Sequence, residues 1–380
     1  EELEVMKFEL LPGAELGYHF TSNILKVDIL CKSFGNERTR TLIVKMKPAE
    51  DGLKKEYIQE MPMFDREIEI YTKVFPQMVE IMMQVGDMND QAPRLLYHNE
   101  DRSTLVLEDI TKQGYELHKE ILGFNDFLKV VEHLARFHAQ SYYIQDNQYD
   151  HPVDLTKYPC MTTENVMKKM KILYDGFDVL KEEVKTWPGY EKYSDKIASL
   201  KDKFPSELLK IYQPHPGSLN VLCHGDFTLN NLMFIKENGE IHDTILLDFQ
   251  LCFWASPAID LFSAFYAIGN AECRKRREEI LMNYQIAFSE YLHLYQSIKN
   301  PPTLLELNIE MLRAGILEIL WVVCFLPFYY VKFSEKDFEK MFNASSEEVD
   351  NIRRTMDRNE AVIEMIKEVL PDLLHRGILT

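Results

Sequence analysis

The chain is poor in cysteine, with 6 in 380 residues, and no two of them form a CxxC pair. Their spacing matches neither a disulfide framework nor a zinc site. We therefore expect reduced thiols and a cytoplasmic protein. No secretory signal peptide is visible. Because the chain starts at Glu1 rather than at methionine, we take it to be a trimmed fragment that could have lost a targeting segment.

Positive charge is also scarce, since 43 Lys and Arg stand against 61 Asp and Glu, for a formal net charge of −18. This balance excludes nucleic acid and anionic membrane as expected partners, because both are polyanions. Net charge does not describe a single cleft, so a local cationic site for a small phosphate ligand is compatible with it.

Long uninterrupted apolar runs are lacking. The most apolar segment, residues 315–333, contains Glu318 and Pro327 and is barely long enough to span a bilayer. We expect a buried core helix there and no membrane span. The sequence does not indicate the oligomeric state.

No internal repeat or low-complexity tract is present, and 380 residues are too many for one small core. Residues up to about 109 are strand-rich with one helix, and the strands are expected at 22–33, 40–47 and 103–110. The later part is mostly helical, with one β-hairpin at 232–249. Helices are expected at 125–144, 165–180, 193–212, 272–295, 304–324 and from 346 to the end.

These patterns predict an α+β fold with two lobes. The expected amino-terminal, nucleotide-binding lobe covers residues 1–110, and a hinge lies at about 107–114. The expected catalytic and substrate-binding lobe covers residues 115–380.

The hairpin is centred on Asn238-Gly239, the strongest short signal for a type I′ turn. A two-residue loop without irregularity places Asn231 opposite Leu246 and puts Asp248 on the same face as Asn231. Such diagonal neighbours lie roughly 7–8 Å apart. An amide oxygen and a carboxylate at that separation suit a magnesium ion.

Asp226 stands five residues before Asn231, on the loop that leads into the hairpin. The spacing Asp-x4-Asn, followed by a strand-end Asp-Phe, is that of kinase-type phosphoryl-transfer sites. In such sites one carboxylate orients the attacking hydroxyl, while two further oxygen ligands hold the metal. The alternative is a polar turn with Asp248 capping a strand end, and the combination of both halves favours the first interpretation.

A cation for the nucleotide phosphates is predicted at Lys45, which Val44 and Met46 flank within a strand. A buried lysine needs a partner. Glu67 supplies one, because it lies on the inward stripe of the following helix with Phe64, Ile68, Tyr71 and Phe75. The alternative is a solvated salt bridge.

The signal for a phosphate-covering loop is weak. Gly13 and Gly17 are present, but no GxGxxG motif is. The backbone of residues 18–22 could cover the phosphates, and an ordinary loop explains the same residues equally well.

Four motifs together resemble the kinase-like superfamily of small-molecule phosphotransferases, which includes aminoglycoside and choline kinases. They are "LCHGDFTLNNLMF", "ILLDFQLCFWASPAIDL", "LVLEDI" and "LARFHAQS". The closer similarity is to the ecdysteroid kinase-like family, and it extends over residues 13–277. The resemblance implies a bilobal protein-kinase-like fold, with ATP and Mg2+ as cofactors. It also implies transfer of the γ-phosphoryl group to a hydroxyl of a small molecule, such as an ecdysteroid.

Carried over by position, the resemblance implies that Asp226 is the catalytic aspartate. Asn231 and Asp248 would be the magnesium ligands. Lys45 would bind the α- and β-phosphates and be held in place by Glu67.

The hinge would border the adenine. The nucleotide-binding residues expected beside Lys45 are Ser22, Glu108, Asp109 and Ile110. Asp260 would steady the catalytic loop and His224 would orient it. His138 is expected to be a core histidine with its hydrogen bonds satisfied.

Two departures from protein kinases affect the expected substrate. Gly225 stands where protein kinases carry the arginine that binds a phosphorylated activation loop. Only six residues, 251–256, separate "DFQ" from "PAIDL", which leaves no room for a segment that docks a peptide. A protein substrate is therefore not expected. Gln250 replaces the glycine of a DFG triplet and should hinder the backbone flip that glycine permits.

Several alternatives remain open for the acceptor. One is a detoxifying kinase of xenobiotic or glycoside hydroxyls, and another is a kinase of choline or ethanolamine. A non-enzymatic alternative is a nucleotide-binding pseudokinase. An aromatic set could line an apolar cleft for a sterol or could simply be core, namely Trp254, Trp321, Phe325, Phe328, Tyr329 and Tyr330.

Overall fold

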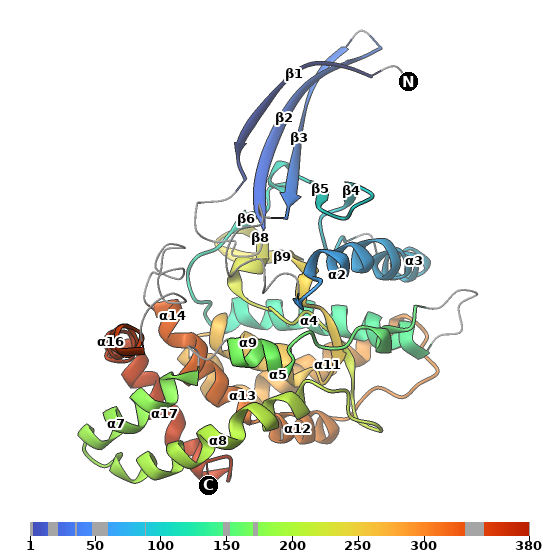
Figure 1. Cartoon of the computed structure of the whole chain (residues 1–380). Coiled ribbons are helices and arrows are strands. Elements are labelled where there is room, and N and C mark those ends of the chain that lie inside the picture. The colour runs from blue at the N-terminus through green and yellow to red at the C-terminus, as the bar shows by residue number, and fades with distance from the viewer. Residues whose placement is uncertain are drawn as a thin grey trace.

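The computed structural model describes residues 3–13, 22–34, 36–47, 60–87, 89–146, 153–169, 174–330 and 346–379. The amino-terminal part contains a five-stranded antiparallel sheet with the strand order β1-β2-β3-β5-β4 (Figure 1). The strands are β1 (Leu3–Pro12), β2 (Asn23–Ser33), β3 (Asn36–Met46), β4 (Leu95–His98) and β5 (Thr104–Glu108). β3 is the central strand, so the residues near its carboxyl end lie between β2 on one side and β5 on the other.

One long helical segment packs beneath this sheet. It consists of α2 (Met63–Glu69), the π-helical segment η1 (Ile70–Val74) and α3 (Phe75–Val85). Its apolar stripe is buried, and it ends at Gly86, whose φ of 74° suits a glycine at a helix carboxyl end. The predicted helix around Glu67 is therefore present.

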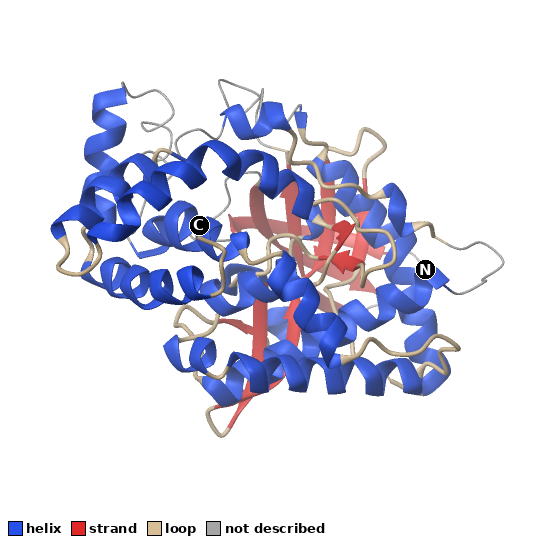
Figure 2. Cartoon of the chain, turned by 90° about the horizontal axis from the view of Figure 1, so that it is seen from below, coloured by secondary structure: helices blue, strands red, loops and turns tan. Residues whose placement is uncertain are grey.

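The remainder is mainly helical and surrounds the central helix α4 (Phe124–Asp146) (Figures 1 and 2). α4 packs against α11 (Arg277–Leu294), while every residue of α9 (Ala258–Ala267) is buried. The other helices are α5 (Glu164–Lys169), α7 (Gly176–Glu183), α8 (Ser194–Ile211), α10 (Ala271–Lys275), α12 (Leu304–Arg313), α13 (Ile316–Ile319), α14 (Leu326–Tyr330), α16 (Ser346–Asp357) and α17 (Glu360–His375).

This arrangement confirms the α+β class. β5 ends at Glu108, and the short 3-10 helix η2 (Ile110–Gln113) follows, where the sequence predicts the hinge. The division into lobes at residues 1–110 and 115–380 stays a prediction.

Within the described residues, the later part of the chain has five further strands. β6 (Glu116–Leu117), β8 (Leu232–Glu237) and β9 (Glu240–Leu246) form a three-stranded sheet. β7 (Val221–Cys223) pairs with β10 (Phe253–Ala255). The pairing of β7 with β10 was not predicted, because three-residue strands carry almost no periodic signal.

The predicted hairpin turn is correct, and so are the pairs next to it, Glu237 with Glu240 and Lys236 with Ile241, but the predicted register is wrong further from the turn. Asn238 and Gly239 have φ values of 53° and 87°, as a type I′ turn requires. A bulge follows at Ile235/Lys236, after which Leu232 rather than Asn231 lies opposite Leu246. His242 is the extra residue of the bulged strand.

The apolar segment after residue 304 is broken rather than continuous. Among the described residues, no single helix is both long and apolar enough to cross a bilayer. The helices at 304–313 and 316–328 meet that test only as a pair, which is bent by 52°. Trp321 is 8% exposed and packs in the core with Trp254, which is 7% exposed.

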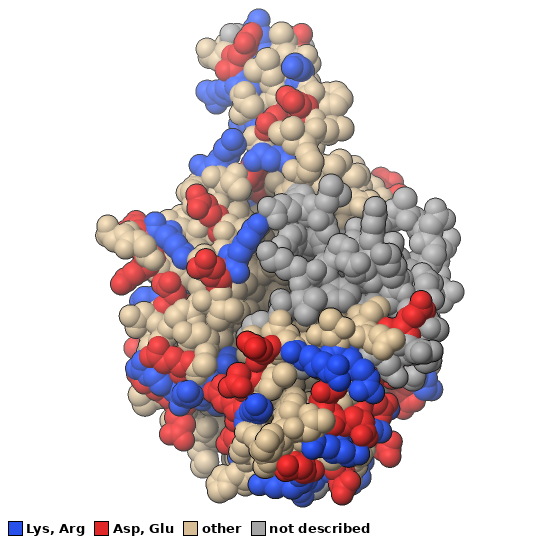
Figure 3. All heavy atoms as spheres, turned by 90° about the vertical axis from the view of Figure 1, so that its left-hand side faces the viewer, with Lys and Arg blue, Asp and Glu red and all other residues tan. Residues whose placement is uncertain are grey.

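Surface charge and cysteine state agree with the composition. On the face shown in Figure 3, acidic and basic side chains are interspersed rather than gathered by sign. All six cysteines are free thiols, and five of them are buried.

Candidate active site

Lys45 is the second-last residue of β3, the central strand of the sheet, and lies opposite Ile24 in β2 and Leu105 in β5. Its side chain is almost fully buried. Lys45 Nζ lies 2.8 Å from Glu67 Oε2 and 2.8 Å from Asp248 Oδ1. The expected pair with Glu67 is therefore buried rather than solvated, and the lysine also reaches the end of the hairpin.

Burial and the neighbouring charges shift the pKa values of Lys45 and Glu67 in opposite directions. Burial raises the pKa of Glu67 to about 7, although Lys45 opposes the shift. Burial would lower the pKa of Lys45, but the carboxylates of Asp248 and Glu67 outweigh it, and the pKa is raised. Lys45 is thus held as a cation between two acids.

Asp226 and Asn231 face one another across the loop between β7 and β8. Asn231 Nδ2 donates to Asp226 Oδ2 and to the Asp226 carbonyl oxygen, both at 2.8 Å. This leaves the amide oxygen of Asn231 as the atom suited to a cation. Burial raises the pKa of Asp226, and the nearby Asp248 carboxylate raises it further.

Asp260, at the amino end of α9, anchors the loop that carries Asp226. Its carboxylate accepts hydrogen bonds from the backbone N–H groups of His224 at 2.6 Å and Gly225 at 3.0 Å. It also lies 3.0 Å from His138 Nε2, and His138 Nδ1 lies 2.8 Å from the hydroxyl of Tyr284. His138 is buried with a partner at each ring nitrogen, as the sequence predicts.

Gly225 and His224 fix the loop against the strand end. Gly225 has a φ of 82°, and a Cβ atom there would lie 2.2 Å from the Leu251 carbonyl oxygen. Any side chain at this position would therefore clash with backbone. His224 Nε2 lies 2.9 Å from the Leu247 carbonyl oxygen, so it joins the loop to the residue before Asp248.

Asp248 and Phe249 form the turn after the hairpin. Asp248 adopts a φ of 63°, which is uncommon outside glycine and is enriched in asparagine and aspartate. Phe249 is fully buried, with ring-centroid distances of 5.6 Å to Tyr71 and 4.7 Å to Phe75. It thereby packs the aspartate's turn against the helix that carries Glu67.

The residues fit a hard divalent cation that is completed by substrate phosphates. Among the described residues, no group of three His, Cys, Asp or Glu side chains is arranged to hold a metal alone. The site instead offers the oxygens of Asp248, Asn231 and Asp226. Mg2+ commonly takes one or two carboxylates and shares its remaining positions with phosphates and water. Repulsion between Asp226 and Asp248, which raises the pKa of Asp226, is what such a cation would relieve.

The acidic side chains of the predicted hinge are paired with other residues of the protein. Glu108 forms a bidentate pair with Arg94 at 2.7 and 2.8 Å. Asp109 pairs with Lys26 at 2.9 Å and caps η2 through the N–H of Thr111. Contact with an adenine would therefore use backbone groups of Glu108, Asp109 and Ile110 rather than these two carboxylates.

Ser22 is buried at the start of β2, two residues before Ile24, which pairs with Lys45. Its hydroxyl has no hydrogen-bond partner within the part of the chain that the structure describes. The remainder of the predicted phosphate-covering stretch, residues 18–21, lies outside the described residues.

One residue that the sequence did not reveal is Arg66. Its guanidinium donates to the carbonyl oxygens of Cys252 and Pro159 and lies 5.1 Å from the ring of Tyr158. It thus ties α2 to the segment that follows Phe249. Arg66 stands in "FDREIE", where alternating charges are typical of a solvated helix face, so the motif carries no signal of this contact.

A lysine–glutamate pair facing a strand-end aspartate, beside a loop with the spacing Asp-x4-Asn, is the arrangement of kinase-type phosphoryl-transfer sites. The family comparison agrees with this class. The model of the ecdysteroid kinase-like family matches residues 16–297, so the chain belongs to that family. No curated protein matches it.

Several solved structures are similar to this chain over nearly its whole length. The GDP complex of wild-type aminoglycoside 2'-phosphotransferase-IIIa is 10% identical, with a TM-score of 0.43, over 96% of this chain and 92% of that one. A microcompartment-associated aminopropanol kinase is 12% identical, with a TM-score of 0.41, over 92% and 90%. Macrolide 2'-phosphotransferase MphH from Brachybacterium faecium is 11% identical, with a TM-score of 0.37, over 93% and 92%.

Proposed function

We propose that the protein is an ATP-dependent kinase that transfers the γ-phosphoryl group to a hydroxyl of a small molecule. The observation that carries this proposal is the position of Lys45, 2.8 Å from both Glu67 and Asp248, two acids brought together from separate parts of the chain. Membership of the ecdysteroid kinase-like family supports the same reaction class.

In this proposal, Lys45 binds the α- and β-phosphates of ATP, and Glu67 sets the position of its ammonium group. Asp248 and Asn231 hold Mg2+, which when bound neutralises the charge of the phosphates. Because ATP would bring its own negative charge, Asp248 would exchange part of its contact with Lys45 for the metal. The protein's contribution to rate is then mostly positioning.

Asp226 accepts the proton of the attacking hydroxyl. Its raised pKa makes it a better proton acceptor than an ordinary aspartate, while the hydrogen bond from Asn231 fixes which oxygen faces the substrate. His224, Gly225 and Asp260 act through this loop and position it.

The acceptor we propose is a lipophilic alcohol such as an ecdysteroid, and the support is the family to which the chain belongs. Hydroxyls of xenobiotics or glycosides are the second candidate, followed by choline-type alcohols. A protein acceptor is disfavoured, because only the 3-10 helix η7 (Phe249–Leu251) and β10 lie between Asp248 and the start of α9.

The test is a screen for ATP consumption with steroids, amino alcohols and phenolic glycosides, in which mass spectrometry detects a phosphate adduct. Wild-type protein should phosphorylate at least one class, and Asp226→Asn should reduce turnover about 10²–10⁴-fold, the usual contribution of a general base. ATP binding without any adduct across the panel would support the pseudokinase alternative. Undiminished turnover by Asp226→Asn would reject the assignment of Asp226.

A further inference from the structure

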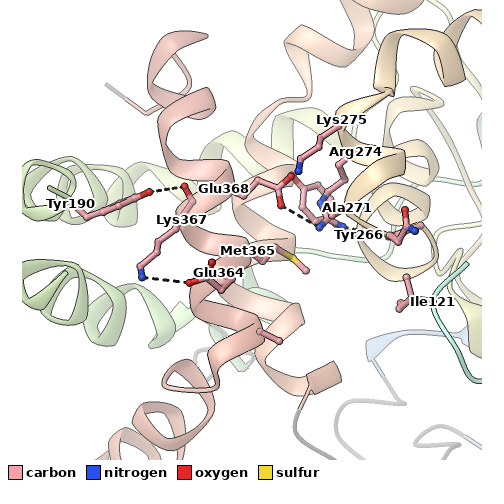
Figure 4. A pocket seen from close by; sticks show the side chains of 13 residues that line it. Ile121, Tyr190, Tyr266, Ala271, Arg274, Lys275, Glu364, Met365, Lys367 and Glu368 are labelled. Carbon is pink, nitrogen blue, oxygen red and sulfur yellow. Dashed lines mark hydrogen bonds and ion pairs between the residues drawn. The ribbon is translucent and has the colours of Figure 1, made fainter. Parts of the chain in front are cut away.

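A cavity of about 720 Å³ lies at the far end of α9 from the catalytic loop (Figure 4). Its lining comes from α17, from α10 and the two residues before it, from Tyr266 in α9, from Tyr190 and from Ile121, which follows the hinge. None of Lys45, Glu67, Asp226, Asn231 or Asp248 lines it. The volume is within the range of small-molecule sites, roughly 300–1,000 Å³.

Arg274 stands between this cavity and an adjoining one of about 600 Å³, because it lines both. Its side chain is only 9% exposed, yet its contacts are long. Nη2 lies 3.6 Å from Glu368, and Nη1 donates to the Gly269 carbonyl oxygen at 3.4 Å. Nε is buried and has no hydrogen-bond partner in the described part of the chain.

Two neighbouring arginines, Arg277 and Arg376, have much shorter contacts with a carboxylate than Arg274 has. Arg277 and Arg376 each lie 2.7 Å from the buried carboxylate of Glu318, which also accepts a hydrogen bond from Tyr266 at 2.9 Å. Each of these two arginines therefore has a short contact with a carboxylate, although buried guanidinium nitrogens without a hydrogen-bond partner occur in both of them as well, within the described part of the chain. Arg274 is not part of that network, and leaving a buried guanidinium incompletely paired is unfavourable.

The surroundings of Arg274 suit an oxyanion attached to an apolar body. Its guanidinium lies 5.7 Å from the ring of Tyr266, which limits its orientations. Lys275 and Lys367 line the same cavity together with Glu364 and Glu368, so that with Arg274 the lining has three cations and two carboxylates. Met365 and the half-exposed Ile121 supply apolar wall. Arginine binds carboxylate and phosphate groups through two parallel hydrogen bonds.

We propose that this cavity binds a small organic anion, whose carboxylate, sulfate or phosphate group pairs with Arg274 and whose apolar body lies along α17. α9 rises about 1.5 Å per residue, so Tyr266 lies about 9 Å along the helix from Asp260, the anchor of the catalytic loop. A ligand here is therefore either the far end of an extended acceptor or a separate effector. Either ligand would pair with Arg274 through the same kind of oxyanion group.

The first test is fluorescence titration with anilinonaphthalene sulfonate and with its uncharged parent, phenylnaphthylamine. Wild-type protein should bind the sulfonate saturably and more tightly than the parent. Arg274→Gln should weaken sulfonate binding roughly 10- to 100-fold, the worth of a charge-assisted pair, and leave the parent unaffected. Arg274→Lys should retain part of the affinity, and Ala361→Phe, which fills the cavity from its edge, should weaken both probes.

Lys201→Gln, a cation on α8 away from the cavity, is the matched control and should change neither affinity. Equal sulfonate affinity in wild type and Arg274→Gln, or no preference for the sulfonate over the parent, would overturn the proposal. This test needs no turnover, so its outcome is independent of the proposed kinase activity. With a detected acceptor, competition between sulfonate and acceptor would assign the cavity to the acceptor site, and inhibition or activation without competition would assign it to an effector.

Discussion

Lys45 Nζ lies 2.8 Å from Asp248 Oδ1, although 203 residues separate them in the chain. This contact joins the central strand of the amino-terminal sheet to the turn after the hairpin. Because Glu67 completes the cluster from α2, three separate elements must be in place before the lysine has both partners. The predictions below perturb those elements one at a time.

Glu67→Gln should remove one of the two anionic partners of Lys45 while keeping the size of the side chain. We expect kcat/KM for ATP to fall about 10²-fold, the effect of displacing a reacting group by about 1 Å. Glu69→Gln is the control, because Glu69 lies on the same helix in an exposed pair with Lys73 at 2.7 Å. Steady-state kinetics with varied ATP measures both, and equal losses in the two variants would contradict the role of the buried pair.

Glu67 should also make the free energy of unfolding depend on pH. Its pKa in the folded protein is about 7, above the ordinary value of 4.5, because burial disfavours the charged form. A raised acid pKa means that the folded state binds more protons, so this contribution to stability falls as pH rises from 4.5 to about 7. The free energy of unfolding of Glu67→Gln, measured with urea at several pH values, should lack that fall. If it changes with pH equally in wild type and variant, the raised pKa of Glu67 is contradicted.

Gly225→Ala should distort the catalytic loop. Alanine would be placed at a φ of 82° with its Cβ 2.2 Å from the Leu251 carbonyl oxygen. We expect a loss of at least about 1–3 kcal/mol of stability, the scale of local backbone strain, together with loss of turnover. Gly217→Ala is the control, since its φ of 76° is similar and no atom lies within 4 Å of the added Cβ. If Gly225→Ala and Gly217→Ala unfold at the same urea concentration, the expected steric clash at position 225 is contradicted.

Arg66→Met should loosen α2 from the segment after Phe249, since the carbonyl oxygens of Cys252 and Pro159 would lose their donor. Because Arg66 acts through Glu67, we expect a higher KM for ATP, with partial rescue in Arg66→Lys. Arg102→Met is the control, because Arg102 also pairs with α2, through Asp65 at 3.1 Å, but on the surface. A purely structural role would lower thermal stability in Arg66→Met without raising KM.

The elements with strong periodicity or turn chemistry could be predicted from the sequence. The stripe that places Glu67 inward is such a case, as are the Asn238-Gly239 turn and the long helix α4. Each depends on interactions within a short window of chain, where residue type and spacing determine the outcome. Lys45 and Glu67 followed from such local patterns, whereas Asp248 was placed beside Asn231 through a hairpin register that the structure corrects.

Other features depend on contacts between distant segments and could not be predicted. The extra residue at His242 shifts the hairpin register by one, and no residue type signals a bulge there. Arg66 resembles a surface residue until Cys252 and Pro159 are folded against it. The incomplete pairing of Arg274 likewise becomes visible only once α17 has packed beside α10.

The most direct measurement of the central claim is calorimetric titration with ATP, in the presence and absence of Mg2+, of wild type, Asp248→Asn and Asp226→Asn. We predict that wild type binds ATP tightly only with Mg2+, that Asp248→Asn loses this dependence, and that Asp226→Asn keeps it while losing turnover. Binding by wild type that does not respond to Mg2+, or the same loss of affinity in both variants, would contradict the division of the site into nucleotide-holding and acceptor-orienting carboxylates.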